Sequence, residues 1–404
     1  MFYLTTKNKE DCYGCGGCQL VCPNQFIIMC NDHEGFLYPE KSSNNCGTCN
    51  LCESVCPNVN KGKIECKKGQ LMAYLGIHKD DKTLQESSSG GVFSGVAQAF
   101  CVDDYRVFGV QFGEKLKVEH AYVSHVDQIT RFRKSKYVFS DMSDTYEMVK
   151  AFLIEGKKVL FTGTPCQIAG LRLYLNKEYE KLLCVDFICR GVPSQKTFDL
   201  YIDFLREKYQ GAVEAFSFRH KTYSWLRGWN SRNVKFTVDG REVVLSSVDD
   251  PYLRGYYKSL FYRPSCYQCK YANVERVSDI TMADFWGVEK LFPEVEVHRG
   301  CSVILANTKK GQEWVAKLEE FMKMEEVKLS DVIKRNSQLR EPAKRHTKRD
   351  VFFSNFGEHD FETVVNLCVP KETIPFKKDV VKFIPYKVRK IIKQLRCERQ
   401  QEME

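Results

Sequence analysis

Two runs of cysteines near the start of the chain have the spacing that iron–sulfur chemistry uses. Each run reads C-x2-C-x2-C-x3-C-P, and the second follows the first at an offset of 34 residues: Cys12, Cys15, Cys18 and Cys22, then Cys46, Cys49, Cys52 and Cys56. The pattern is typical of bacterial ferredoxins with two 4Fe-4S clusters, in which the fourth cysteine of a run ligates the other cluster. We therefore predict one cluster on Cys12, Cys15, Cys18 and Cys56, and another on Cys46, Cys49, Cys52 and Cys22.

The alternative for these cysteines is structural zinc. Zinc sites normally use separated C-x2-C pairs that supply one tetrahedral set each. Two unbroken four-cysteine runs, each followed by proline at Pro23 and Pro57, fit that arrangement poorly. The spacing favours iron–sulfur clusters over zinc.

Composition and charge narrow the class of protein further. The chain has 404 residues, 19 of them cysteine, and 43% are hydrophobic, as expected for a globular protein of two or three domains. Met1 to Glu10 lacks the apolar run of a signal peptide, so a disulfide framework is a poor explanation and we expect a cytoplasmic location. The net charge of +9 is concentrated between Lys371 and Arg399, which argues against a general nucleic-acid-binding surface.

Beyond Leu71 the sequence alternates between strand and helix patterns. These patterns predict an α/β domain, or alternatively α+β, with a mixed sheet. The expected strands are 157–162, 181–189, 279–283 and 302–307, with a hairpin over 233–245 that turns at Asp239-Gly240. The expected helices are 92–100, 167–175, 195–209 and 312–324. In the cysteine-rich segment, 26–38 is expected to form a strand pair that turns at Gly35.

Two short segments have the chemistry of an anion site. Ser87-Ser88-Ser89-Gly90-Gly91 precedes an apolar helical run, and backbone N–H groups at a helix start attract phosphates. The alternative is an ordinary serine cap of that helix. Lys134-Ser135-Lys136-Tyr137 is a basic strip that can meet a phosphate or a carboxylate, or simply face solvent.

Several longer words in this region occur together in one known family. They are ESSSGGVFSGVA (86–97), KSKYV (134–138), GTPCQIAGLR (163–172), CRGVPS (189–194), CYQCKY (266–271) and RVSDITMADFWG (276–287). In this order they resemble the coenzyme F-420 hydrogenase/dehydrogenase beta-subunit family, whose members include flavin-dependent reductases. An N-terminal module with two clusters is common in that family too.

The resemblance implies two cofactors in the larger domain. One is FAD, with its phosphates near Ser88, Ser89, Gly90 and Gly91 and with Lys134 and Lys136 close by. The other is a third 4Fe-4S cluster, whose ligands by position are Cys166, Cys189, Cys266 and Cys269. The alternative is that Cys166 and Cys189 are buried small hydrophobes. The remaining cysteines are interpreted as core or surface thiols.

One residue departs from the resemblance. The family often has histidine after the second of these four cysteines, and this chain has Arg190. The substrate is therefore expected to differ from that of relatives with histidine, and nothing in the sequence requires coenzyme F-420 itself.

The sequence thus predicts an iron–sulfur flavoprotein oxidoreductase with an unknown small-molecule substrate and an electron-transfer protein or reductase as partner. The alternative is an electron-relay subunit without its own substrate, for example in a surface-polysaccharide pathway. The expected domains are 1–68 (ferredoxin-like), 69–326 (flavin and iron–sulfur) and 327–404 (a basic extension). In the extension, Val388, Ile391, Ile392 and Leu395 recur at helical spacing, so a helix there can dock on protein or contact an anionic membrane surface.

Overall fold

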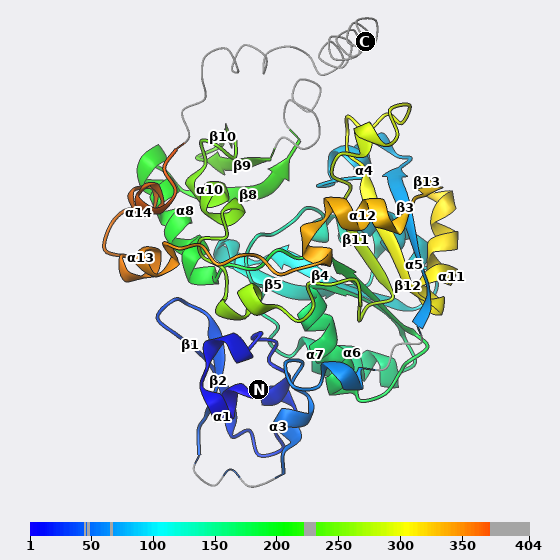
Figure 1. Cartoon of the computed structure of the whole chain (residues 1–404), viewed down its shortest axis with the longest axis horizontal. Helices are drawn as coiled ribbons and strands as arrows, with labels where there is room; N and C mark the ends of the chain where they lie inside the picture. The colour runs from blue at the N-terminus through cyan, green and yellow to red at the C-terminus, as the bar shows by residue number, and fades with distance from the viewer. Residues whose placement is uncertain (44–45, 47–48, 65–67, 222–231, 372–404) are drawn as a thin grey trace, which may run out of the picture.

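A computed structural model shows one large mixed sheet with helices on both faces, and a small cysteine-rich module packed at one end (Figure 1). The structure describes residues 1–43, 46, 49–64, 68–221 and 232–371. Within these ranges no helix is both long and apolar enough to cross a membrane. The predicted α/β class with a mixed sheet is confirmed.

The large sheet has eight strands in the order β13-β3-β12-β11-β7-β6-β4-β5. In that order they span Met322–Glu326, Lys68–His78, Ser302–Thr308, Ile280–Asp284, Leu182–Phe187, Lys158–Gly163, Tyr105–Phe112 and Val118–Val123. The four neighbours β11, β7, β6 and β4 are parallel, and all other pairs in the sheet are antiparallel. The carboxyl ends of the parallel strands therefore meet at one edge, where ligands bind in open α/β sheets.

Helices cover both faces because the central strands are apolar on both sides. Along β6, Leu160 packs with the cluster that holds α5 (Val92–Phe100) and α11 (Lys309–Ala316). Val159 and Phe161 pack on the opposite face with α6 (Thr145–Ile154) and α7 (Pro165–Leu175). The short helices α4 (Asp81–Gln85) and α12 (Leu329–Arg335) cover that second face beside β3 and β12.

A second layer of structure lies beside the sheet. Strands β8 (Val213–His220), β9 (Asn233–Val238) and β10 (Arg241–Leu245) form an antiparallel sheet, with the hairpin turn at Asp239-Gly240 as predicted. It packs with α8 (Gln195–Tyr209), α10 (Pro251–Tyr257), α13 (Arg349–Ser354) and α14 (Phe361–Cys368) around buried aromatic side chains.

The cysteine-rich module is a small unit of short elements. Its strands β1 (Ile27–Asn31) and β2 (Leu37–Lys41) pair antiparallel, as the sequence predicted, with Gly35 in the turn at φ +81°. The helices α1 (Tyr3–Thr6), α2 (Gly17–Leu20) and α3 (Leu51–Ser54) complete it. Tyr3 and Tyr38 of the module belong to the same apolar core as α8 and α13, so the module is docked on the larger domain.

Two expectations about the later part of the chain need correction. The segment 312–324, predicted as one helix, contains the end of α11, a 3-10 turn at Lys317–Glu320 and then the start of β13, which pairs with the edge strand β3. In the region expected to be an extension, Phe352, Phe361 and Val365 are buried in the core. The basic amphipathic helix expected around 388–395 lies outside the described residues.

Candidate functional site

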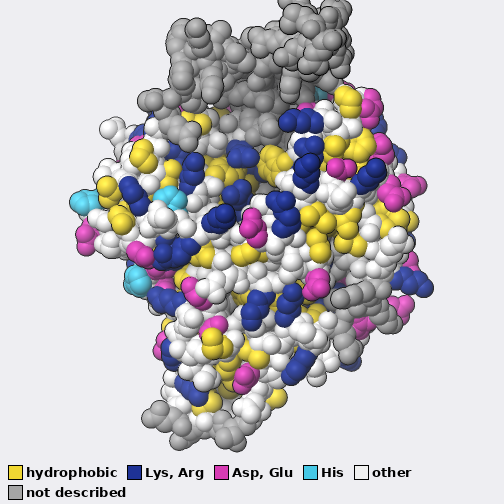
Figure 2. All heavy atoms as spheres, viewed as in Figure 1, with side chains coloured by type: hydrophobic (Ala, Val, Ile, Leu, Met, Phe, Trp, Pro, Cys, Tyr) yellow, Lys and Arg dark blue, Asp and Glu magenta, His cyan; other side chains and the backbone are white. Residues whose placement is uncertain are grey.

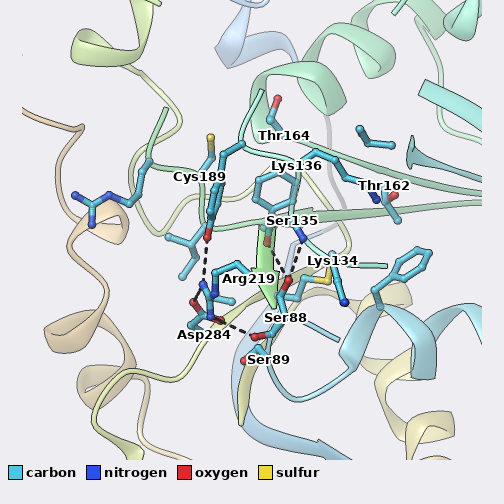
Figure 3. Close-up of a pocket in the computed structure, with 18 of the residues that line it drawn as sticks. Ser88, Ser89, Lys134, Ser135, Lys136, Thr162, Thr164, Cys189, Arg219 and Asp284 are labelled. Carbon is cyan, nitrogen blue, oxygen red and sulfur yellow. Dashed lines mark hydrogen bonds and ion pairs between the residues drawn. The ribbon is translucent and has the colours of Figure 1, made fainter. Parts of the chain in front are cut away.

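A cavity of about 470 Å³ opens at the carboxyl ends of the parallel strands (Figure 3). Its walls include Thr162 and Gly163 at the end of β6, Phe187 at the end of β7, and Asp284 at the end of β11. The volume lies within the range of pockets that bind small molecules and cofactors. It is therefore the candidate binding site of the larger domain.

The serine–glycine loop, which the sequence suggested as an anion site, forms one wall of this cavity. Ser88, Ser89 and Gly91 line it, and Gly91 caps α5 with φ +85°, a conformation that favours glycine. The Ser88 hydroxyl accepts a hydrogen bond from the Ser135 N–H at 2.9 Å, which joins the loop to the basic strip. The amino end of a nine-residue helix thus faces the cavity.

Gly90 has a different role from the rest of the loop. It does not line the cavity, and a Cβ at this position would lie 2.1 Å from the Gly76 carbonyl oxygen and 2.7 Å from the Ser302 nitrogen. Glycine is thus required for packing against β3 and β12. A bulky substitution at Gly90 would test folding rather than phosphate binding.

Lys134 and Lys136 of the basic strip both line the cavity, but their ammonium groups differ in the contacts that they make. The Lys136 ammonium donates to the backbone carbonyls of Arg133 at 2.8 Å and Arg131 at 3.1 Å, and burial lowers the pKa of Lys136 to about 7. Lys134 has φ +66° and forms no ion pair with a described carboxylate. Burial lowers the pKa of Lys134, while Glu86 acts in the opposite direction.

Arg219 is a cavity residue that sequence reasoning did not single out. Its guanidinium makes two hydrogen bonds to Asp284, at 2.7 and 3.2 Å, and also donates to the Tyr137 hydroxyl and the Ser88 carbonyl (Figure 3). The residue is buried with φ +55°, an uncommon conformation for arginine that surrounding contacts must enforce. No local sequence pattern signals such a conformation.

The cavity lining is strongly basic. Asp284 is its one acidic residue among those described, and Arg219 pairs with it; the basic lining residues are Arg133, Lys134, Lys136, Arg190, Arg219, Arg232 and Arg335. Figure 2 shows that Lys and Arg side chains also gather on the surface between α12 and the β8–β10 sheet. Such a lining suits an anionic ligand.

The four cysteines of the larger domain come together beside this cavity. Cys166 is in the first turn of α7, Cys189 follows β7, and Cys266 and Cys269 belong to or follow the 3-10 turn Pro264–Gln268. Burial raises the pKa of Cys189, and the thiols of Cys266, Cys166 and Cys269 raise it further. Four mutually close, half-buried thiols form a donor set that fits an iron–sulfur cluster.

The N-terminal module brings its first predicted set together as well. A small cavity of about 30 Å³ is lined by all four of its members, Cys12, Cys15, Cys18 and Cys56, together with Gly14 and Gly16. Both glycines have positive φ, at +71° and +77°, so the loop can wrap closely around the space between the thiols. The structure thus brings Cys56 together with the first three cysteines of the first run.

The four cysteines of the second predicted set are described, although 44–45 and 47–48 between them fall outside the described residues. Burial raises the pKa of Cys52, and the neighbouring thiols of Cys46 and Cys49 raise it further. Cys22 and Cys52 both pack against the apolar group Phe2, Leu4 and Ile27. Cys49 is solvent-exposed, whereas Cys22, Cys46 and Cys52 are half-buried.

The three sets form a series that leads to the cavity. Cys15 lies against α7, the helix that carries Cys166, because a Cβ at Gly170 of that helix would lie 3.1 Å from the Cys15 sulfur. Cys189 belongs to the third set and also lines the cavity. Among the described residues, no three His, Cys, Asp or Glu side chains are close enough to share a single metal ion. A 4Fe-4S cube does not require that, because each thiolate binds a different iron.

The other cysteines lie outside these sets. Cys184, Cys301 and Cys368 are buried, while Cys30 and Cys101 are half-buried. Cys66 and Cys397 lie outside the described residues.

Comparisons with known proteins found similarity over part of the chain. Residues 156–332 match the family of the C-terminal part of the coenzyme F-420 hydrogenase/dehydrogenase beta subunit. A chain of the F-420-reducing NiFe hydrogenase complex from Methanosarcina barkeri, in a xenon derivative, is 16% identical with a TM-score of 0.43; the match covers 69% of this chain and 97% of that chain. A search of curated proteins found no match.

Proposed function

We propose that this protein is an iron–sulfur flavoprotein oxidoreductase, because residues 156–332 match the family of the C-terminal part of the coenzyme F-420 hydrogenase/dehydrogenase beta subunit. It would hold two 4Fe-4S clusters in the N-terminal module, a third between Cys166, Cys189, Cys266 and Cys269, and FAD in the cavity. Its partners would be an electron-transfer protein or a reductase and a small organic substrate.

One observation carries this proposal: Cys189 is both a member of the four-thiol set and part of the cavity wall. A cluster on these thiols would border whatever fills the cavity. The cavity in turn has what a flavin dinucleotide requires, namely its size, a helix amino end at Gly91, and basic side chains such as Lys134 for a diphosphate.

When bound, the clusters would carry single electrons, and the flavin would exchange two with the organic substrate, formally as hydride. The polypeptide would hold these cofactors in their positions relative to one another. The Cys12 set would lie next to the third set, since Cys15 lies against α7, which carries Cys166, and the exposed Cys49 would face an electron-transfer partner. Arg190, which follows Cys189 and lines the cavity, replaces the histidine of many relatives and supports an acidic substrate.

The experiment is anaerobic purification with iron, acid-labile sulfide and released flavin quantified per chain. We expect about twelve irons, about twelve sulfides and one FAD, because each cube contributes four irons and four sulfides. Zinc without labile sulfide would contradict the cluster assignment. Full iron without flavin, and no uptake of supplied FAD, would contradict the enzyme and favour the relay subunit.

A further inference from the structure

Arg263 is a buried arginine that connects two of the cysteine sets. Its backbone lies just before the 3-10 turn that carries Cys266, and its carbonyl accepts a hydrogen bond from the Cys266 N–H at 2.9 Å. Its side chain points away from that turn and into the N-terminal module. Only 1% of the residue is exposed, so the guanidinium is shielded from water.

The guanidinium contacts the first ligand of the Cys12 set directly. Nε donates to the Cys12 carbonyl at 2.7 Å, and Nη2 donates to the Leu37 carbonyl at 2.7 Å and lies 3.5 Å from the Cys12 sulfur. Nη1 is buried and has no hydrogen-bond partner among the described residues. A Cβ at Gly14 would lie 2.7 Å from Nη1, so the cysteine loop closes over the guanidinium because residue 14 is glycine.

The surroundings of this cation contain aromatic rings and no described carboxylate partner. The guanidinium carbon lies 4.3 Å from the Tyr38 ring centroid, 5.5 Å from that of Phe36 and 5.8 Å from that of Phe139. A buried charge is stable only where an opposite charge and hydrogen bonds compensate for its lost hydration. The nearest anionic group that the proposed function supplies is the cluster with its thiolate ligands at Cys12.

We propose, on the basis of the proposed function, that Arg263 is a positioning residue that raises the reduction potential of the cluster held by Cys12, Cys15, Cys18 and Cys56. Reduction makes a thiolate-ligated cluster more negative, so a fixed cation beside it stabilises the reduced form more than the oxidised form. Charge and hydrogen bonds at the ligand sulfurs are among the means by which proteins set these potentials. The higher potential makes an electron more stable on this cluster, which lies next to the third set.

The test measures the midpoint potential of each cluster by redox titration followed by EPR, in the full-length protein reconstituted anaerobically. The Cys12-set signal is assigned with Cys56→Ser. In Arg263→Gln we expect this cluster to become harder to reduce and to shift more than either of the other clusters, with its reduced-to-oxidised ratio at a fixed potential falling at least tenfold, which is 59 mV for one electron. Arg263→Lys, which keeps the charge, should retain most of the potential.

A matched control separates charge from loosened packing. Glu34→Gln/Arg349→Gln disrupts another buried contact between the module and the larger domain without changing net charge, and it should leave the potential unchanged. If Arg263→Gln does not fold, Arg263→His is used instead. As the pH rises from 5 to 8 the imidazole loses its charge, so the potential of the same cluster should fall by more than it does in the wild type.

The inference would be overturned if the potential shifted equally in the double control variant and in Arg263→Gln. Where Arg263→His is used, the same pH dependence of the potential in that variant and in the wild type would also overturn it. So would an unshifted potential in Arg263→Gln. A preparation without iron and labile sulfide would instead contradict the proposed function, so the two failures are distinguishable.

Discussion

Glu34 of the N-terminal module and Arg349 of α13 form a buried ion pair with two hydrogen bonds, one of them 2.8 Å long. Arg349 also donates to the Tyr262 carbonyl, next to Arg263. A residue from near the end of the described chain thus fixes the module beside the loop that leads to Cys266.

Loss of this pair should destabilise the docked module. In Arg349→Gln the Glu34 carboxylate stays buried without its cation, and removing one partner of a buried pair typically costs about 3–5 kcal/mol. Denaturant unfolding of the holoprotein, followed by tryptophan fluorescence and by cluster absorbance, measures the change. The double variant Glu34→Gln/Arg349→Gln should recover much of the loss; an equally unstable double variant would show that the charge is not the cause.

Substitution of a third-set cysteine should remove one cluster and leave the others. In Cys166→Ser or Cys269→Ser, iron should fall by about four atoms per chain, because one cube loses a ligand. Cys301→Ser is the matched control, since Cys301 is buried but belongs to none of the three sets. Unchanged iron content and unchanged EPR spectra in both ligand variants would show that these thiols bind no cluster.

Lys134 is expected to contribute to FAD binding. It lines the cavity beside the serine–glycine loop, and hydrogen bonds to charged groups contribute about 1.5–3 kcal/mol. Lys134→Gln should therefore weaken FAD binding by a factor of ten or more, as measured by fluorescence titration of flavin-depleted protein. Lys117→Gln is the control, because Lys117 pairs with Asp141 at 2.7 Å and does not line the cavity. Equal affinity in both variants would remove Lys134 from the site.

His120 is a buried neutral imidazole behind the cavity wall. Its Nε2 lies 3.1 Å from the Thr162 carbonyl, and its Nδ1 lies 2.8 Å from the Ser140 hydroxyl. Since the carbonyl can only accept, Nε2 carries the proton and the Ser140 hydroxyl donates to Nδ1. Burial lowers the pKa of His120 to about 4, while the Thr162 carbonyl and Asp141 act in the opposite direction.

This lowered pKa predicts the sign of one pH effect. Between about pH 6.5 and 4 the unfolded chain binds a proton at His120 that the folded chain does not, so stability falls as the pH is lowered through that window. From pH 7 to 5.5 the loss due to this residue should be about 1 kcal/mol. We expect His120→Gln to lose correspondingly less than the wild type in urea unfolding at the two pH values. Identical losses would mean that the imidazole is not held neutral.

Local sequence patterns correctly predicted the helices and strands that depend mainly on neighbouring residues. The amphipathic helix 195–209 and the hairpin turning at Asp239-Gly240 occur as expected. The segment 312–324 was mispredicted because a helical pattern continues into Met322, where pairing with the edge of β3 imposes a strand. Pairing with a distant strand overrides local preference there.

The candidate ligands could be named from the sequence, but the residues around them could not. Cysteine spacing indicated the two N-terminal sets and the family resemblance the third, whereas Arg263 contacts Cys12 across 251 positions of the sequence. Arg219 depends on a backbone conformation that no nearby glycine signals. The role of 329–369 was missed because a basic, polar stretch conceals apolar residues, such as Phe352 and Phe361, that pack with distant aromatic side chains.

An anaerobic reductive titration tests the central claim most directly, because it counts the electrons that the whole series accepts. We predict about five electron equivalents per chain, one for each of three clusters and two for the flavin, with the flavin bleaching as the cluster signals develop. Uptake of only about three electrons, with no flavin absorbance to bleach, would contradict the flavoprotein account.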